Sequence, residues 1–515
     1  MENVPYKSLF EKYRDSLLID RWNQFAFWTI SYLVNDSRSI AQDGRAHVSR
    51  DFQAVGSMLV SNLAAKLARL LFPVSVPFFK ASASKSFKKW AKEHGITEEE
   101  LTSQFALLEI LSKDRLLQNS GYASLILALK LLIVTGNALI HRDQEKGSLT
   151  TWSPDCFATR RDSRGRLMDC ILREFSTLDA LPEELRVHFN QLERYKDPET
   201  AVEIYTRIKR VTRGSTQGFE VSQECDDHRV GESSWYPEAL CPWMVPTWVL
   251  IPGEHHGRGL VEEYAADFAR LSSLSEAAAL YGVEMTRVLH LVGPSSGGDI
   301  DELTNAANGE FVRGDQGAIS AYEAGDAGKL QQLGAEIDRV ILRLSKSFMY
   351  TAQARQAERV TAYELQQEAT EAEHGLGGAI STLSGGMQVP LAFLLMTEVS
   401  TEAMTGIVTG EIMPDVTTGI PALGRSSDVQ NLIQAAQEIA GVVPVAGLDK
   451  RLNPARIIDI ILAGRSIDPK TVFFTPEEQQ QNDEAAQAQA QAQQSLIAAQ
   501  TLGQQGEQLA KIQGA

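Results

Sequence analysis

PGEHHGRGLVEEYAADFARLSSLSEAAALYGVEMTRVLHLV, residues 252 to 292, is the stretch that decides the fold. From Tyr264 to Val292 apolar side chains recur every three or four residues, which predicts one face of a helix about 40 Å long at roughly 1.5 Å per residue. The glycines of HHGRG give the backbone freedom to turn, and the two glutamates after them favour a helix N-terminus. We therefore expect a corner into a long helix at Gly257, Arg258 and Gly259.

A second long helix is predicted where apolar residues recur at the same spacing from Leu330 to Phe348. Between the two helices lies the stretch 293–328, which is polar, rich in glycine and short of residues for a core. This order predicts two long helices that frame a protruding insertion.

The chain before the corner divides into two parts. Residues 1–145 are mostly of helical pattern: segment 55–73 ends at Pro73, and segment 120–141 predicts a buried helix that Lys130 makes too short to cross a bilayer. From about 148 to 252 short aromatic and β-branched runs predict strands, namely ETAVEIYTRIKRVT, GFEVSQ and WMVPTWVLI. The fold class is therefore α+β and predominantly α-helical.

A third long helix is predicted from Thr361, which has the spacing of a capping box with Glu364. No charge occurs from Gly375 through Thr397, so a membrane span stays an alternative, but glycines and Pro390 favour a helix that bends or breaks. Two shorter helices are predicted at 426–443 and 454–467, and the Gln/Ala-rich chain beyond them indicates a mobile or partner-dependent helix.

The composition restricts the possible functions. The chain has 515 residues, a formal net charge of −17 and four widely spaced cysteines without a C-x-x-C pair, so a zinc site or a disulfide framework is not indicated. The N-terminus does not resemble a secretory signal. An acidic chain has no general affinity for nucleic acid, yet residues 80–92 and 206–215 are basic, and the second alternates as a strand or sheet edge would. The candidate basic contacts are Lys85, Lys88, Lys89, Arg207, Lys209 and Arg210.

Catalytic patterns are scarce. The sequence has neither a G-x-x-x-x-G-K-[ST] phosphate loop nor an H-E-x-x-H zinc motif. Ser295 lies in a G-x-S-x-G match, but a helix precedes it where a nucleophile elbow needs a strand. The adjacent His255 and His256 have no evident third ligand nearby. We expect no enzyme and no catalytic, cofactor or metal residues, and a serine hydrolase remains an alternative only through Ser295.

Several blocks resemble, in their order, the portal proteins, or head-to-tail connectors, of short-tailed T7-like phages. They include VGSMLVSNLAAKLARLLFPVSVPFF, IVTGNALI, the corner stretch, NGEFVRG, IDRVILRLSKSFM, AERVTAYELQQEATEAEHGLGGAISTLSGGMQVPL and FTPEEQQQ. The resemblance implies the portal fold in a cyclic ring, usually of twelve subunits, with a central channel for double-stranded DNA at one capsid vertex. It implies a wing (1–258), a first stem helix (259–292), a clip (293–328), a second stem helix (329–349), a wing return with a kinked helix or channel loop (350–400), a crown (401–475) and a tail (476–515).

The resemblance also implies partners and a location. Besides its own copies and the passing DNA, these are the major capsid and scaffolding proteins, the large terminase subunit, the tail adaptor or tail tube, and internal core proteins, with no membrane. The protein is expected in the virion, at the junction of head and tail, after assembly in the host cytoplasm. A membrane-associated pore is the alternative function. The candidate channel constriction is Gly375, Gly377, Gly378, Gly385, Gly386 and Met387.

Overall fold

The chain divides into two compact units, residues 1–423 and 424–515, and every residue whose structure is described here belongs to the first. The computed structural model describes residues 4–34, 51–74, 77–181, 183, 186, 201–225, 228–286, 288–292, 301, 305, 307, 319–323, 326–350 and 376–416. The predictions for the capping box at Thr361, for Ser295, for Gly375 and for everything beyond residue 416 lie outside these residues.

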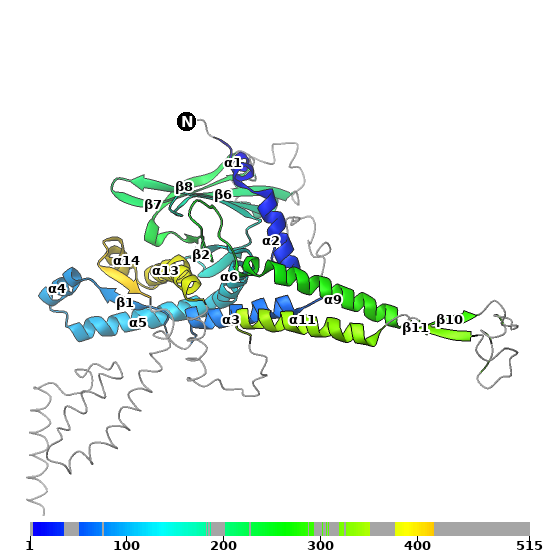
Figure 1. The fold of residues 1–515 in the computed structure, drawn as a ribbon. Coiled ribbons are helices and arrows are strands. Elements are labelled where there is room, and N and C mark those ends of the chain that lie inside the picture. The colour runs from blue at the N-terminus through cyan, green and yellow to red at the C-terminus, as the bar shows by residue number, and fades with distance from the viewer. Residues whose placement is uncertain are drawn as a thin grey trace, which may run out of the picture. The chain divides into compact units, whose positions relative to one another are not determined.

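A helical core lies at the centre of this unit (Figure 1). Segment 55–73 forms the predicted helix, which ends at Leu71, ahead of Pro73. Segment 120–141 is a buried helix only as far as Thr135, because Gly136 adopts φ +80° and directs the chain into a strand. The helices before the corner are α1 (Tyr6–Tyr13), α2 (Ser16–Trp28), α3 (Val55–Leu71), α4 (Lys85–Glu93), α5 (Glu98–Leu117) and α6 (Gly121–Thr135).

A five-stranded antiparallel sheet with the order β4-β5-β6-β7-β8 confirms the predicted strand region. The basic run 206–215 enters β6, which is the middle strand, so the alternative of a sheet edge is wrong. The predicted strand at 243–251 is reduced to two residues that pair with β2. The strands of this sheet are β4 (Phe157–Arg161), β5 (Leu167–Thr177), β6 (Ala201–Arg213), β7 (Thr216–Cys225) and β8 (His228–Pro237), and those of a three-stranded sheet are β3 (Ser148–Trp152), β2 (Leu139–Asp143) and β9 (Trp243–Met244).

The two long helices form an antiparallel pair that projects from the core (Figure 1). After the short helix α8 (Leu260–Glu263), helix α9 covers Ala265–Met285, and α11 covers Ala327–Ser347. The prediction that the first helix reaches Val292 is wrong, because Val288–Val292 is strand β10 and pairs with β11, Ile319–Glu323. A run of VLHLV favours a strand once a partner strand is opposite it.

The glycine-rich segment is helical from Leu376 to Val399. Residues Ser384–Gln388 form a π-helical turn, η6, which leads into α13 (Val389–Val399). The helix is therefore widened by one π turn where a bend or break was predicted. Helix α14 (Thr401–Val408) follows, and strand β12 (Ile412–Asp415) then pairs with β1 (Lys80–Ala83).

Candidate functional site: the helix pair, its glycine corner and a buried ion-pair clamp

The half of the helix pair nearest the core, which we call the inner half, packs through aromatic rings. Phe268 of α9 and Phe348, the residue that caps α11, are buried edge to face with ring centroids 5.6 Å apart. Leu271 and Leu344 are buried beside them. Lys66 of α3 donates a hydrogen bond of 2.7 Å to the carbonyl of Met349, so the end of α11 is also tied to the central core.

The other half of the pair, the outer half, has a polar contact at its far end and leaves apolar side chains in solvent. The ion pairs Arg270–Glu336 and Arg343–Asp267, by contrast, join the two helices nearer the core. At the far end the backbone N–H of Asp326 donates to the Tyr281 hydroxyl over 2.7 Å. Its exposed apolar side chains are Leu280 at 60% and Val283 at 66%, and Leu342 of the inner half is exposed at 58% on the outside of α11.

The corner before α8 packs backbone against backbone. A Cβ on Gly259 would lie 2.7 Å from the carbonyl of Ile133 and 2.8 Å from the nitrogen of Gly136. A Cβ on Gly257 would lie 2.7 Å from the carbonyl of Gly136. Real Cβ atoms do not approach backbone atoms so closely, so the glycines of this corner are required by contact with the end of α6.

Asn137, which follows α6, is hydrogen-bonded to the corner. Its side-chain amide donates to the carbonyl of Gly257 over 2.8 Å and accepts from the N–H of the same residue over 2.7 Å. On the solvent side Arg258 contacts Glu254 at 2.5 Å and Glu262 at 3.9 Å, and Glu262 also pairs with Arg21 of α2 at 2.8 Å.

The two corner histidines have different surroundings. His256 packs edge to face on Trp22, with centroids 5.3 Å apart, and burial lowers its pKa to about 4. His255 is exposed, and its Nδ1 accepts a hydrogen bond of 3.2 Å from the backbone N–H of Arg161. Both rings therefore join the corner to neighbouring elements. Within the described ranges no group of three or more His, Cys, Asp and Glu side chains is placed to hold a metal.

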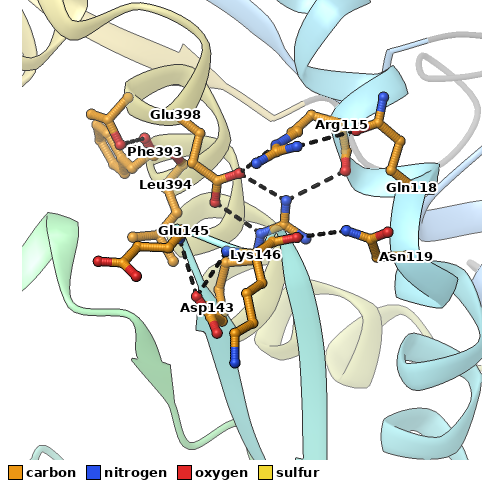
Figure 2. A network of polar contacts seen from close by, with 11 residues as sticks. Arg115, Gln118, Asn119, Asp143, Glu145, Lys146, Phe393, Leu394 and Glu398 are labelled. Atoms are coloured by element: carbon orange, nitrogen blue, oxygen red, sulfur yellow. Dashed lines mark hydrogen bonds and ion pairs between the residues drawn. The ribbon is translucent and has the colours of Figure 1, made fainter.

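A buried ion-pair clamp fixes the end of α13 (Figure 2). Arg142 of β2, which is 0% exposed, donates from Nε and Nη2 to the two oxygens of Glu398, each over 2.8 Å. Arg115 of α5 donates to the same carboxylate over 3.3 Å. The carbonyl of Arg115 also accepts a bond of 3.3 Å from Arg142. Three elements far apart in the sequence thus meet at one carboxylate.

The basic residues of 80–92 are exposed as predicted. Lys85, Lys88 and Lys89 are exposed on α4, and the rings of Phe87 and Trp90 are in tilted contact with their centroids 5.5 Å apart. This helix therefore presents a basic face.

The basic residues of 206–215 do not form a joint patch, because successive side chains of a strand point to opposite faces of the sheet. Arg207 forms an ion pair of 2.5 Å with Asp169 and lies over the ring of Tyr6. Arg210 contacts Glu238 at 2.6 Å. Only Lys209 is exposed among these three. The interpretation of Arg207 and Arg210 as free basic contacts is therefore wrong in this fold.

The candidate constriction residues also divide. Gly377, Gly378 and Gly385 have open space where a Cβ would lie, so they share an exposed face of the helix. Gly386 packs against Pro246, because a Cβ on Gly386 would lie 3.4 Å from the Cβ of Pro246. Met387 is 1% exposed within the central core, so its predicted place at a channel surface does not agree with the structure.

The family model for the bacteriophage head to tail connecting protein matches residues 6–472. The chain belongs to this family. It is 40% identical over 494 residues to the portal protein of Pseudomonas phage phiKMV, covering 95% of this chain and 96% of that protein. It is 30% identical to the portal protein of Enterobacteria phage SP6, covering 94% and 92%, and 28% identical to that of Escherichia phage T7, covering 84% and 81%.

Among solved structures, a chain in the neck of the native gene transfer agent particle matches with a TM-score of 0.36 and 12% identity, covering 81% of this chain and 90% of that chain. Membership of the connector family rests on the sequence relatives. Its function class is therefore that of the phage portal protein, a structural connector of head and tail.

This membership decides between the alternatives. Among the described residues two helices, Glu100–Thr135 and Leu376–Val399, are long and apolar enough to cross a membrane. By length and composition alone, Lys130 therefore does not exclude the first helix as a membrane span, contrary to the prediction from the sequence. Buried helices of a protein core pass the same test, and their inner faces are buried here. A membrane pore is not favoured, since the curated relatives are portal proteins, and the same finding leaves the hydrolase alternative without support.

Sequence reasoning found the corner but missed the clamp and Asn137. Arg115, Arg142 and Glu398 give no local motif, because their partners lie far along the chain. One signal was available: Glu398 is the first charge after the uncharged stretch 375–397. A charge that ends an apolar helix inside a core needs an ionic partner.

Proposed function

We propose that this connector assembles as a closed ring, usually of twelve copies, through whose channel double-stranded DNA is packaged and later ejected. Exposed apolar side chains of the helix pair carry the proposal: Leu280 and Val283 of the outer half and Leu342 of the inner half are left uncovered by the described residues. A neighbouring copy in a cyclic assembly covers such a surface without leaving an open edge.

Within the ring, we assign α9 and α11 to the stem and the insertion between them to the clip. Residues 1–258 and the return segment 350–400 form the wing, and 401–475 the crown. The first stem helix is shorter than the predicted range 259–292, since β10 already belongs to the base of the clip. The exposed face with Gly377, Gly378 and Gly385 is the candidate for the narrow part of the channel.

The net charge of the chain supports the passage of DNA without tight binding. A net charge of −17 repels phosphates, and exposed lysines such as those of α4 are available for weak, sequence-independent contacts. Because the sequence has no phosphate loop, the packaging work would come from a separate ATPase, the large terminase subunit, docked on the clip. Capsid and scaffolding proteins, internal core proteins and the tail adaptor are the other proposed partners, in the virion after assembly in the host cytoplasm.

Negative-stain electron microscopy of the purified chain tests the ring. End-on averages with a central hole and twelve-fold symmetry are expected. The double variant Leu280→Glu with Val283→Glu places charges on the outer half and should shift the protein to monomers, measured by mass photometry. Ser273→Glu, on an exposed position of the same helix, is the matched control and should leave rings intact. A monomer at every protein and salt concentration for the unaltered chain would refute the proposal.

A further inference from the structure

An apolar groove of about 820 Å³ is lined by side chains of α4, α5, α14 and β12, which lie together at one end of the described unit (Figure 1). The lining includes Phe87 and Trp90 of α4 and Leu107 and Leu111 of α5. Ile412 of β12 also contributes to it. A concave and mostly apolar surface of this size is the usual form of a binding site.

The elements around the groove are fixed by caps and by backbone hydrogen bonds. Strand β12 pairs with β1, which leads into α4. The N–H of Ser84 donates to the carbonyl of Glu411 over 2.7 Å, and the Ser84 hydroxyl accepts from the N–H of Phe87 over 3.1 Å. Helix α5 begins with a capping box between Thr97 and Glu100. The walls of the groove are therefore positioned by the fold itself.

The surface of α5 beside the groove is exposed but carries no exposed charge. Within the stretch 101–112 the only charged residue is Glu109, which is buried and accepts a hydrogen bond of 2.9 Å from the N–H of Ala81. By contrast, Leu107 is 51% exposed and Leu111 is 44% exposed. The solvent face of a helix ordinarily carries charged residues, and an apolar patch without them is typical of the centre of an interface.

Helix α4 adds an aromatic side chain and positive charge to this surface. Trp90 lines the groove and is 47% exposed, and tryptophan is among the residues that contribute most to binding at interfaces. The one acid of this helix, Glu93, lies 3.9 Å from Lys89. The exposed lysines of α4 outnumber it and are Lys85, Lys88, Lys89 and Lys92. The groove therefore has an apolar centre and a basic side.

This combination restricts what the groove can bind. Double-stranded DNA would contact the lysines through its phosphates but would leave the apolar centre exposed. A peptide that adds a strand to a sheet needs a free backbone edge, whereas this groove is lined mainly by side chains of helices. An amphipathic helix fits a groove of this kind, because its apolar side chains recur on one face.

We propose that the groove binds an acidic amphipathic α-helix of another protein. The apolar face of this helix packs on Trp90, Leu107 and Leu111, and its acidic side chains lie beside the lysines of α4. Such a contact needs neither a ring nor a channel, so it goes beyond the proposed function and does not rest on it.

The net charge of the chain makes this preference diagnostic. A chain with a net charge of −17 repels an acidic peptide at most of its surface and attracts a basic one. Binding of an acidic peptide therefore requires a local group of cations together with apolar contact. General adhesion would produce the opposite preference.

Fluorescence anisotropy with the full chain tests the groove. The probe is a fluorescein-labelled designed peptide of about five helical turns, with leucine on one face and glutamate on the other. A second peptide has lysine in place of every glutamate. We expect the acidic peptide to bind at least tenfold more tightly than the lysine peptide, and its affinity to fall as salt rises. Equal affinities, a preference for the lysine peptide or no binding would overturn the proposal.

Variants at exposed positions locate the binding. Trp90→Ala should weaken binding of the acidic peptide at least tenfold, and Leu107→Gln, on α5, at least fivefold. Lys88→Glu should also weaken it at least fivefold. Lys209→Glu reverses an exposed lysine of β6, is the matched control and should change the affinity less than twofold. Equal losses in Lys88→Glu and Lys209→Glu would indicate a general effect of charge and would contradict the proposal.

Two other occupants have distinct outcomes. Binding of the chain to phosphatidylserine vesicles but not to the acidic peptide would make the groove a membrane contact. Loss of rings in Leu107→Gln, without peptide binding to the parent chain, would make it a contact between copies. Either result overturns the proposal. Peptide binding by a parent chain that forms no rings would support the groove and refute only the proposed function.

Discussion

The inner and outer halves of the helix pair are built from the same two helices, yet they differ in how much apolar surface they bury. In the inner half, Phe268 and Phe348 are buried together, and Lys66 holds the end of α11 through the carbonyl of Met349. In the outer half, Tyr281 is hydrogen-bonded to Asp326 at the far end, and Leu280 and Val283 face solvent. The same amphipathic pattern therefore packs the inner half against the core and leaves an exposed apolar surface on the outer half for another molecule.

The magnitudes show which half stabilises the chain. Burial of a phenylalanine side chain contributes about 1.5–3 kcal/mol, whereas a half-exposed ion pair such as Arg270–Glu336 contributes about 0–1 kcal/mol. The inner half is thus part of the folding core. The outer half depends on the inner half for its position and contributes its apolar surface to assembly.

The first prediction tests how much an aromatic side chain of the inner half stabilises the subunit. Phe348→Ala should lower the free energy of unfolding by about 3–5 kcal/mol, because it leaves a cavity between Phe268 and Tyr264. Guanidinium unfolding followed by tryptophan fluorescence, at a concentration where subunits are separate, measures the change. Leu342→Ala on the same helix is the matched control and should change this quantity by less than about 0.5 kcal/mol.

The control has a second expected effect. In the assembled protein Leu342→Ala should reduce the fraction of subunits in rings, measured by mass photometry, although subunit stability is unchanged. If Leu342→Ala destabilised the isolated subunit as strongly as Phe348→Ala, the distinction between the buried and the exposed side of the helix pair would be wrong.

The second test concerns the clamp. Glu398→Gln leaves two arginines, one of them fully buried, without their carboxylate, and should cost about 3 kcal/mol or more. Glu336→Gln removes the partner of the half-exposed Arg270 and should cost under about 1 kcal/mol. The midpoint of thermal unfolding at fixed protein concentration measures both. Equal losses would mean that burial does not determine the value of these ion pairs.

Local sequence patterns predicted the elements whose structure depends on local chemistry. Helix α3 ends before Pro73, and α11 follows its predicted apolar stripe, because periodicity and breakers act over a few residues. The prediction failed at Val288–Val292, where apolar residues fit both a helix and a strand. Pairing with β11, about 30 residues further along the chain by the register of the two strands, decided for the strand.

The candidate site was less predictable because its contacts are distant in sequence. The bond from Arg142 to Glu398 joins residues separated by 256 positions, and that from Asn137 to Gly257 joins residues separated by 120. The basic run in β6 was misinterpreted for a different reason: strand alternation places Arg207 and Arg210 on opposite faces, each beside an acid from another segment. Charge counted along a sequence does not show which charges are neutralised in the fold.

The third prediction compares a glycine of the corner with a glycine of the outer half. Gly259→Ala would force a Cβ to within 2.8 Å of backbone atoms of α6, which cannot move aside, so a loss of about 3 kcal/mol in unfolding free energy is expected. Gly282→Ala in the outer half meets no atom within 4 Å and should stabilise the chain by up to about 1 kcal/mol, since alanine favours a helix. Thermal unfolding of both variants measures the difference, and a tolerated Gly259→Ala would contradict the close packing of the corner.

The smallest expected effect comes from pH and belongs to the corner at the inner end. Burial lowers the pKa of His256 from its ordinary 6.5 to about 4, so between these values the unfolded chain binds a proton that the folded chain excludes. The stability due to the neutral ring is complete above pH 6.5 and lost as the pH falls to 4, with about 2 kcal/mol missing at pH 5.

His256→Phe keeps a ring against Trp22 but does not titrate, so its unfolding midpoint should fall less between pH 7 and pH 5. The outer half contains no histidine in α9 or α11, and a variant there such as Gly282→Ala should follow the parent chain. Parallel pH profiles for the parent and His256→Phe would show that the corner histidine does not exclude its proton.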